Sequence, residues 1–199
     1  MATFDASTSG RAVPVVRLVR PEEAEAAGQV VVGAFAAVPG AHMNGGYANE
    51  LADVAGRAMQ SEVLVAVDES GVVGCVTFVP DHRSPLAEQV RPGECQVRMM
   101  AVAPAYQGRR LGQLLLDAAL ERARLLGKEA VFLHSTPAMT AAHRLYQRNG
   151  FVRVPDRDWI PEPDLTLIGF RLDLTGGPGA GPGAGPAEGT AGTRSTTPD

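Results

Sequence analysis

One stretch decides the fold of this chain, MMAVAPAYQGRRLGQLLL at residues 99–116. An apolar strand passes there through a proline break and a basic, glycine-containing loop directly into a helix. Such a loop turns backbone N–H groups outward, and the first helical turn adds N–H donors without helix partners and a partial positive charge. Gly108 and Gly112 can adopt backbone angles closed to other residues, and Arg109 and Arg110 can add charge-assisted contacts. The stretch therefore predicts a binding site for an anion such as a pyrophosphate.

The composition fits one globular domain with flexible ends. The chain has 199 residues, of which 45% are hydrophobic and 20% charged, which suffices for a core of ordinary size. Residues 1–14 are small and polar, and residues 176–199 begin with Gly-Pro-Gly-Ala repeats that cannot bury enough apolar area to offset their chain entropy. We therefore expect a disordered segment at 1–14, one domain at 15–175 and a disordered Gly/Pro-rich tail at 176–199.

Charge and cysteine content exclude several classes of protein. The formal net charge of −4 disfavours a general binder of nucleic acid or anionic membranes, which needs a cationic face. Cys75 and Cys95 lie far apart in apolar runs without metal-ligand spacing, which is typical of buried free thiols in a reducing compartment. Residues 1–20 lack the apolar segment of a secretory signal, and no run is long enough to span a bilayer. We expect a cytoplasmic protein without a metal site and with no nucleic-acid or membrane partner.

Periodicity and turn residues predict strands and helices along the whole domain. The predicted strands lie at 15–20, 62–67, 72–79, 95–102, 130–134, 151–154 and 165–174. The predicted helices lie at 21–37, 47–59, 111–126 and 137–149. This order is that of an α+β protein.

A second landmark is AAHRLYQRNGF at residues 141–151, a predicted helix that carries a Leu-Tyr pair and ends in Gly-Phe. Together with the run from Gln107 to Gly112, it resembles the acetyl-CoA-binding core of the GNAT superfamily of N-acetyltransferases, whose loop signature reads Gln/Arg-x-x-Gly-x-Gly/Ala. Arg110 stands where the family usually has its first signature glycine. The resemblance covers residues 15–174. It implies a mostly antiparallel sheet of six to seven strands, flanked on both faces by about four helices.

The resemblance also implies acetyl-CoA as co-substrate and assigns residues to it. In the family, the strand before the loop splays from its neighbour and exposes backbone groups that pair with the pantetheine arm. Met100, Ala101 and Val102 match that segment, although a plain buried strand would explain their side chains equally well. The residues that match the phosphate-binding loop are Gln107, Gly108, Arg109, Arg110, Leu111, Gly112 and Gln113.

The general acid is assigned by the same match. Tyr146 corresponds to the tyrosine that lies near the CoA sulfur in many members of the family. A phenol with a pKa of about 10 is protonated at neutral pH and can give a proton to a thiolate leaving group. The alternative is that Tyr146 only packs with Leu145 in the core.

The general base has several candidates. Gln96 occupies the strand position where many relatives carry glutamate, and an amide is not a useful proton acceptor. Glu94, two residues earlier on the same strand face, is the carboxylate that we assign to this role, directly or through water. His134 and His82 have a suitable pKa range. Ordered water without a protein base is a further alternative.

The resemblance implies an enzyme that transfers an acetyl group from acetyl-CoA to a primary amine by direct attack. The acceptor, a small molecule or a peptide amine, is left open, as is a homodimer. The family holds its acceptor near the elements at 24–37 and 47–59. One rival is a CoA-binding domain that has lost catalysis, motivated by Arg110 and Gln96. The other is a dinucleotide-binding oxidoreductase, which the missing Gly-x-Gly-x-x-Gly run disfavours.

Overall fold

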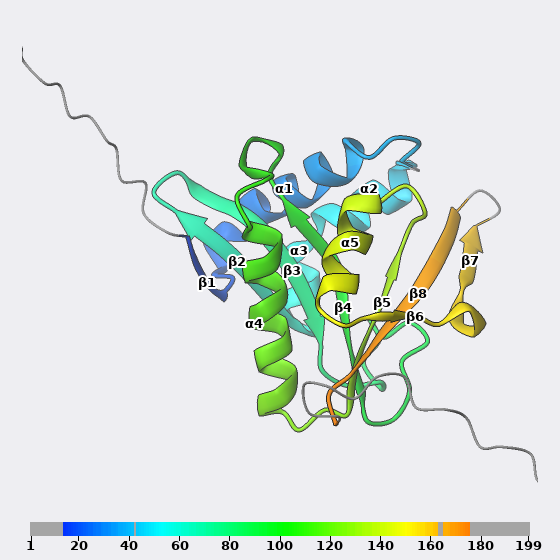
Figure 1. Ribbon diagram of the computed structural model, residues 1–199. Coiled ribbons are helices and arrows are strands. Elements are labelled where there is room, and N and C mark those ends of the chain that lie inside the picture. The colour runs from blue at the N-terminus through cyan, green and yellow to red at the C-terminus, as the bar shows by residue number, and fades with distance from the viewer. Residues whose placement is uncertain (1–13, 42, 163–164, 176–199) are drawn as a thin grey trace, which may run out of the picture.

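The structure is a computed structural model that describes residues 14–41, 43–162 and 165–175 (Figure 1). Its central sheet has the strand order β1-β2-β3-β4-β5-β8-β6, and β7 pairs with β8 off this path. The strands are β1 (Val15–Leu18), β2 (Glu62–Asp68), β3 (Gly71–Val79), β4 (Glu94–Val102), β5 (Ala130–Ser135), β6 (Val152–Arg153), β7 (Trp159–Glu162) and β8 (Leu165–Asp173). The helices are α1 (Ala24–Ala36), α2 (Gly45–Ala52), α3 (Val54–Ala58), α4 (Leu111–Leu125) and α5 (Thr140–Arg148). Short 3-10 turns lie at η1 (Pro21–Glu23), η2 (Pro104–Tyr106) and η3 (Pro155–Arg157).

The sheet is antiparallel throughout except between β4 and β5, which run parallel. Helices α1, α2 and α3 lie on one face of the sheet, and α4 and α5 lie on the other (Figure 1). The predicted α+β fold is confirmed. The described residues add one strand that the sequence analysis did not predict, β7, which contains Pro161 and buries none of its residues.

The predicted helix at 47–59 is two helices. Asp53 ends α2 and begins α3, and its backbone (φ −76°, ψ 67°) leaves the helical region. Its carboxylate accepts a hydrogen bond from the N–H of Gly56 (2.8 Å), which is the usual way to cap a helix N-terminus. The guanidinium of buried Arg57 then donates to the carbonyl groups of Glu50 and Leu51 at the end of α2. These bonds fix α2 against the sheet.

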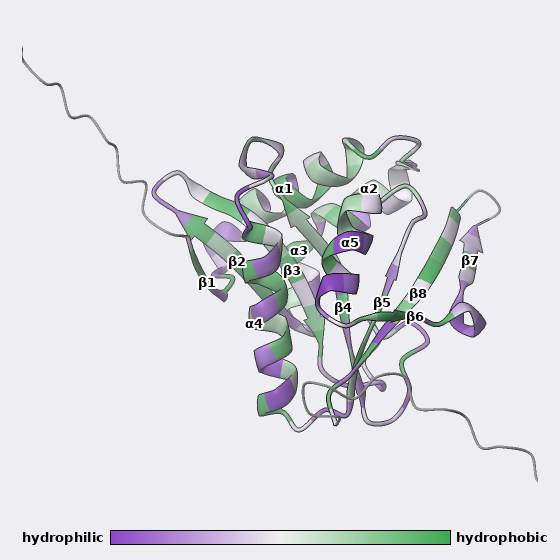
Figure 2. Cartoon of the chain, in the orientation of Figure 1, coloured by the Kyte–Doolittle hydropathy of each residue, from purple (hydrophilic) through white to green (hydrophobic). Residues whose placement is uncertain are grey.

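Two hydrophobic clusters fill the two faces of the sheet, as the apolar strands and helix faces in Figure 2 indicate. One contains Leu115 and Leu116 from α4, and the other contains Val31 from α1 and Leu51 from α2, all fully buried. The predicted free, buried thiols are confirmed, since Cys95 belongs to the first cluster and Cys75 to the second. Burial raises the pKa of both thiols to about 12.

The strand β4 changes direction in its second half. Cys75 on β3 is paired with Ala101, but Thr77 is paired with Arg98, so β4 holds one residue more than β3 over this interval. The extra residue is a bulge, and Met99 has a left-handed backbone (φ 48°) at that point. The pairing of β4 with β5 ends at Gln96, shortly before this bulge.

The predicted disordered ends at 1–14 and 176–199 lie outside the described residues, apart from Pro14. Within the part of the chain that is described, every helix is too short or too polar to cross a membrane.

Two glycines of α1 make a matched test of the packing between α1 and α2. A Cβ at buried Gly28 would collide with the backbone carbonyl oxygen of Ala52, whereas a Cβ at exposed Gly33 meets nothing within 4 Å. Gly28→Ala should lower the free energy of unfolding by about 2 kcal/mol, because backbone must move. Gly33→Ala should raise it by about 0.5–1 kcal/mol through helix propensity. Urea unfolding of both variants measures these changes, and equal effects would contradict the packing described.

Candidate active site

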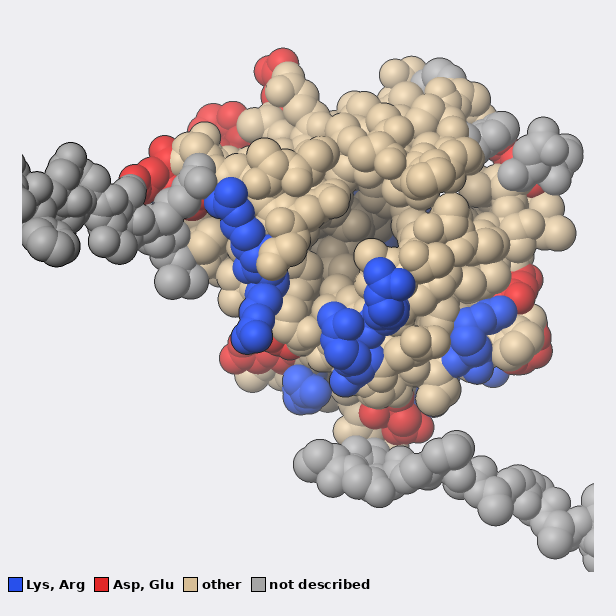
Figure 3. Space-filling model, turned by 45° about the horizontal axis from the view of Figure 1, so that its top comes forward, with Lys and Arg blue, Asp and Glu red and all other residues tan. Residues whose placement is uncertain are grey.

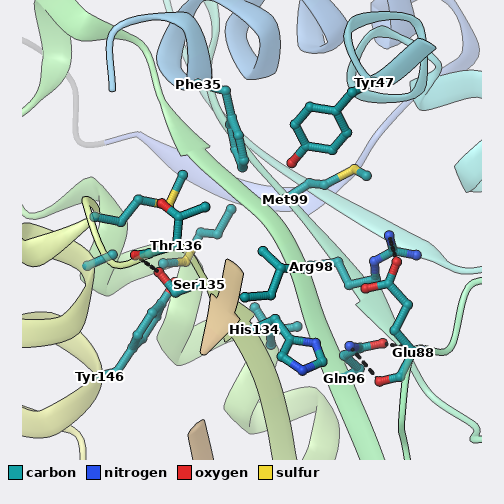
Figure 4. A pocket seen from close by; sticks show the side chains of 15 residues that line it. Phe35, Tyr47, Glu88, Gln96, Arg98, Met99, His134, Ser135, Thr136 and Tyr146 are labelled. Atoms are coloured by element: carbon teal, nitrogen blue, oxygen red, sulfur yellow. Dashed lines mark hydrogen bonds and ion pairs between the residues drawn. The ribbon is translucent and has the colours of Figure 1, made fainter. Parts of the chain in front are cut away.

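A cleft opens where β4 and β5 separate. The two strands pair only from Glu94 to Gln96 on β4 and from Ala130 to Phe132 on β5. Past these residues the strands diverge, and a pocket lies between them (Figure 4). Its lining comes from α1, α2, both strands and α5, and comprises Phe35, Tyr47, Glu88, Gln96, Val97, Arg98, Met99, Met100, His134, Ser135, Thr136, Met139, Ala142, Tyr146 and Leu167.

The backbone of β4 faces this cleft with groups that the sheet leaves unused. The N–H of Ala103 donates to Val73 on β3 (2.9 Å). Because successive residues of a strand point their N–H and C=O groups to opposite sides, those of Met100 and Val102 are directed away from β3, toward the side that β5 has left. Ala101 points its groups to β3, and its side chain is buried. A ligand with amide groups would complete the strand pairing here.

The loop after β4 leads into the open N-terminus of α4. Gly108 (φ 79°) and Arg110 (φ 62°) both have left-handed backbone conformations. Arg110 is the N-cap of α4, and the first helical hydrogen bond runs from the N–H of Leu114 to its carbonyl. The N–H groups of Leu111, Gly112 and Gln113 therefore have no helix partner and point out of the helix end.

Side chains around the loop hold it in place. Tyr106 is hydrogen-bonded to Ser70 in the β2–β3 turn (2.7 Å), and the guanidinium of Arg109 lies 4.9 Å from the centroid of the Tyr106 ring. The Gln113 side chain exchanges two hydrogen bonds with the Asn149 amide (2.7 and 3.0 Å), which joins α4 to the end of α5. The side chain of Gln113 thus has a structural role, and its backbone N–H stays available to a ligand.

The surface over this region carries positive charge. Figure 3 shows a hollow in one face with Lys and Arg side chains along part of its rim, while Asp and Glu side chains lie toward the edge of the molecule. Exposed arginines stand in the loop, Arg109 and Arg110, and on α5, Arg144 and Arg148. Such residues favour a ligand with several phosphate charges.

Tyr146 reaches the cleft from α5. Its side chain is 6% exposed, packs against Phe151 and Phe170 and also lines the pocket. Burial raises the pKa of its phenol above the ordinary value of 10. The phenol therefore stays protonated at neutral pH, as a proton donor must. The ring thus belongs both to the core and to the pocket wall.

Glu94 lies at the start of β4, and the pocket lining does not include it. Its carboxylate, 5% exposed, accepts hydrogen bonds from Arg157 (2.8 and 2.9 Å) and Arg171 (3.0 Å). Burial acts to raise the pKa of this carboxyl, but the hydrogen bonds from Arg157, the Arg91 N–H and Arg171 outweigh it and hold the pKa below its usual range. Glu94 is therefore held in a buried ion cluster and does not line the pocket.

Of the two histidines considered as bases, one lines the pocket and the other does not. His134 lines the pocket, but its Nε2 lies 3.0 Å from the carbonyl oxygen of Arg157 and its Nδ1 is buried without a partner. Burial lowers the pKa of this imidazole. His82 lies beside Asp81 (3.4 Å) and outside the pocket lining. Trp159 packs against His134, with ring centroids 5.9 Å apart.

Several residues of the site were not predicted from the sequence. Phe35 from α1 and Tyr47 from α2 point into the pocket from the side opposite Gln96 (Figure 4). Glu88 comes from the loop between β3 and β4, and Arg98 from β4 itself. A second pocket of about 260 Å³ adjoins the first and shares Phe35 and Tyr47 with it. Its remaining lining is Val38, Pro39, Gly40, Ala41, Met43, Thr136, Pro137, Ala138, Met139, Leu165 and Thr166.

This arrangement of a split sheet beside an anion-binding loop agrees with the comparison to known families. Residues 28–151 match the model of the acetyltransferase (GNAT) family, and this match contains the loop and the helix α5. The chain belongs to the GNAT family. The match covers the elements that form both walls of the cleft.

Individual relatives cover the GNAT chain to different extents. A mycothiol acetyltransferase of Propionibacterium freudenreichii is 34% identical over 89 residues, which are 45% of this chain and 27% of that protein. The chain thus spans about a quarter of the length of this curated relative. An acetyltransferase structure from Staphylococcus aureus has a TM-score of 0.65 at 14% identity, covering 81% of this chain and 99% of that one. A putative acetyltransferase from Salmonella typhimurium, solved with acetyl-CoA, has a TM-score of 0.60 at 22% identity and covers 82% and 95%. These structures support the fold.

Glu94→Gln separates a structural carboxylate from a catalytic one. The substitution leaves two arginines without their shared negative partner, so the free energy of unfolding should fall by about 3 kcal/mol at neutral pH. Because the pKa of Glu94 is lowered in the folded state, its contribution is present above the unfolded pKa and is lost as the pH falls. The deficit should therefore shrink below pH of about 4. Unchanged stability with lost turnover would make Glu94 the base.

Proposed function

We propose that this GNAT chain transfers an acetyl group from acetyl-CoA to a primary amine by direct attack. The observation that carries the proposal is the parting of β4 and β5 directly beside the open N-terminus of α4. One feature suits the amide-containing arm of CoA and the other its pyrophosphate. The two lie in sequence order along one continuous segment, so a single extended ligand can reach both.

The residues present fit acetyl-CoA. We assign the backbone of Met100, Ala101 and Val102 to the pantetheine arm. The pyrophosphate would take the N–H groups of the loop, with Gln107 at its exposed start. A Cβ at Gly112 would meet Leu145 of α5 (3.4 Å), so the missing side chain lets α4 and α5 approach closely. The binding residues of the loop are Gln107, Gly108, Arg109, Arg110, Leu111, Gly112 and Gln113.

The reaction asks little of the side chains once the partners are aligned. Bound acetyl-CoA supplies the thioester, whose carbonyl carbon is the group that the amine attacks. The site orients the two partners and excludes water, which is a large part of the rate enhancement in such reactions. We assign Tyr146 as the general acid that protonates the departing thiolate, because its buried phenol keeps its proton at neutral pH.

Gly112→Val tests the cofactor assignment. The β-branched side chain restricts the backbone and crowds the phosphates, so the affinity for CoA should fall at least about tenfold, or 1.4 kcal/mol. Arg110→Gly is the control, because glycine adopts the observed left-handed conformation without strain. It should keep the melting temperature and lose less affinity. Calorimetry with CoA measures both, and a folded Gly112→Val protein that binds like the parent would remove the phosphate loop from the proposal.

Tyr146→Phe tests the acid. Phenylalanine keeps the packing against Phe151 and Phe170 and removes the proton donor, so kcat should fall about 10²- to 10⁴-fold with little change in stability. Acetyl transfer is measured as the release of free CoA thiol, with amines of different classes as acceptors. An unchanged kcat would return Tyr146 to a packing role. A parent protein that binds CoA and acetylates no amine would favour a CoA-binding domain without catalysis.

A further inference from the structure

The β3–β4 loop is pinned to β4 by one buried amide. Gln96 is fully buried, and its side chain bonds both backbone groups of Glu88: its Oε1 accepts from the Glu88 N–H (3.0 Å), and its Nε2 donates to the Glu88 carbonyl (3.2 Å). A carboxylate has no proton to donate and could make only the first bond. Glutamine at position 96 therefore fixes the backbone of Glu88 against the strand in a way that glutamate cannot.

This attachment brings a carboxylate into the cleft. The Glu88 side chain lines the pocket next to Arg98, whose Nη2 donates to Glu88 (2.5 Å) and whose Nη1 donates to the Leu86 carbonyl (2.7 Å) (Figure 4). Arg98 also reaches Glu50 on α2 (3.2 Å), so one guanidinium stands between two carboxylates. Of the two carboxylates, Glu88 is the one that lines the pocket, so it is the one that can meet a cationic ligand there.

Glu88 is the only carboxylate among the described residues that line either pocket. The other ionisable groups at the site are less suited to accept a proton. Burial raises the pKa of the Tyr47 phenol to about 12, and the Nδ1 atom of His134 is closed off from solvent. Burial also raises the pKa of Glu88, against the opposing effect of Arg98, which makes this carboxylate a better proton acceptor than an exposed one.

The adjoining pocket has the opposite character. Of the described residues that line it, none carries a charge, and most are apolar. Its volume of about 260 Å³ lies just below the usual range for ligand pockets, about 300–1,000 Å³. Four residues, Phe35, Tyr47, Thr136 and Met139, belong to both pockets. One molecule can therefore occupy them together, with its charged end near Glu88 and its apolar body beyond Tyr47.

We infer that the acceptor is a primary monoamine with a small apolar body, that Glu88 is the catalytic residue that binds its ammonium group and removes a proton, and that Gln96 positions Glu88. The inference rests on the proposed acetyl transfer and specifies its second substrate. The apolar body occupies the second pocket. A polyamine or an aminoglycoside would bring extra charges to a pocket wall that cannot pair them.

An aliphatic amine arrives as an ammonium ion at pH 7, with a pKa near the 10.4 or so of lysine. Glu88 takes one proton, which frees the nitrogen lone pair, and later releases this proton to solvent. The C–N bond forms, the C–S bond breaks, and the second nitrogen proton leaves to water. The thiolate receives its proton from Tyr146, which is reprotonated from solvent.

The test compares two carboxylates on the same arginine, with 2-phenylethylamine as the acceptor. Glu88→Gln keeps the backbone bonds to Gln96 and should lower kcat/KM for the amine at least about 100-fold. Calorimetric binding of 2-phenylethylamine to the protein–CoA complex should be lost, and the Kd for CoA should change less than about threefold. Glu50→Gln is the control, because Glu50 is 49% exposed in its side chain and lines neither pocket. Full activity in Glu88→Gln, or equal losses in both variants, would overturn the assignment.

Gln96→Glu tests the positioning. It removes the donor to the Glu88 carbonyl, so Glu88 is no longer held in place and the KM for the amine should rise. The added negative charge should move the acidic limb of the kcat/KM profile, set by a carboxyl that faces Arg98, Glu50 and Tyr47, to higher pH. Suppose that Gln96→Glu instead raises activity and that adding Glu88→Gln does not lower it. The catalytic carboxylate is then the one at position 96 on β4, and the inference is wrong.

A panel of amines tests the substrate class. 2-Phenylethylamine should be acetylated at least about tenfold more efficiently, in kcat/KM, than spermidine or kanamycin. The reverse order in an active protein would overturn the apolar acceptor and leave the proposed acetyl transfer intact. A protein that binds CoA and acetylates none of the three, nor lysine or peptide N-termini, would fail the proposed function itself.

Discussion

The sheet of this GNAT protein gives up its hydrogen bonds between β4 and β5 after three residue pairs, and the rest of the molecule is arranged around that loss. Unpaired backbone groups are costly unless another partner takes them. The bulge at Met99 also shifts the register of β4 against β3 by one residue. A cofactor with amide groups can take the place of the missing strand neighbour, so the fold and its need for a ligand have one physical origin.

The sequence predicted what depends on local residues. The open N-terminus of α4 could be predicted because glycines, arginines and a helix start stand in one stretch, and its geometry needs no distant partner. The α+β order followed from the periodicity of the strands and helices. Arg110 departs from the family pattern, and the structure shows why the departure is tolerated: the residue caps α4 with φ of 62°, a conformation that glycine prefers but that arginine can adopt at a modest cost.

What depends on distant contacts was not predicted. Glu94 appeared to be an available carboxylate, but its neutralising partners come from η3 and β8, 63 and 77 residues further along the chain. Gln96 appeared to be a defect at the base position. The role of Gln96 becomes visible only in the structure, where the loop that carries Glu88 folds back onto it. Pairings of this kind leave no mark on periodicity or composition, because they are set by where the strands finally lie.

The ion cluster of Glu94, Arg157 and Arg171 joins an early part of the chain to two late parts. Glu94 precedes the two arginines by 63 and 77 residues, so a chain that ends before η3 has neither counter-charge for this carboxylate. Contacts of such long sequence separation are slow to form, because the loop between them must close first. The strands β1 to β4 pair in chain order, whereas β5 gains its antiparallel neighbour only when β8 is present. The ion cluster is therefore complete last, when Arg171 on β8 reaches Glu94.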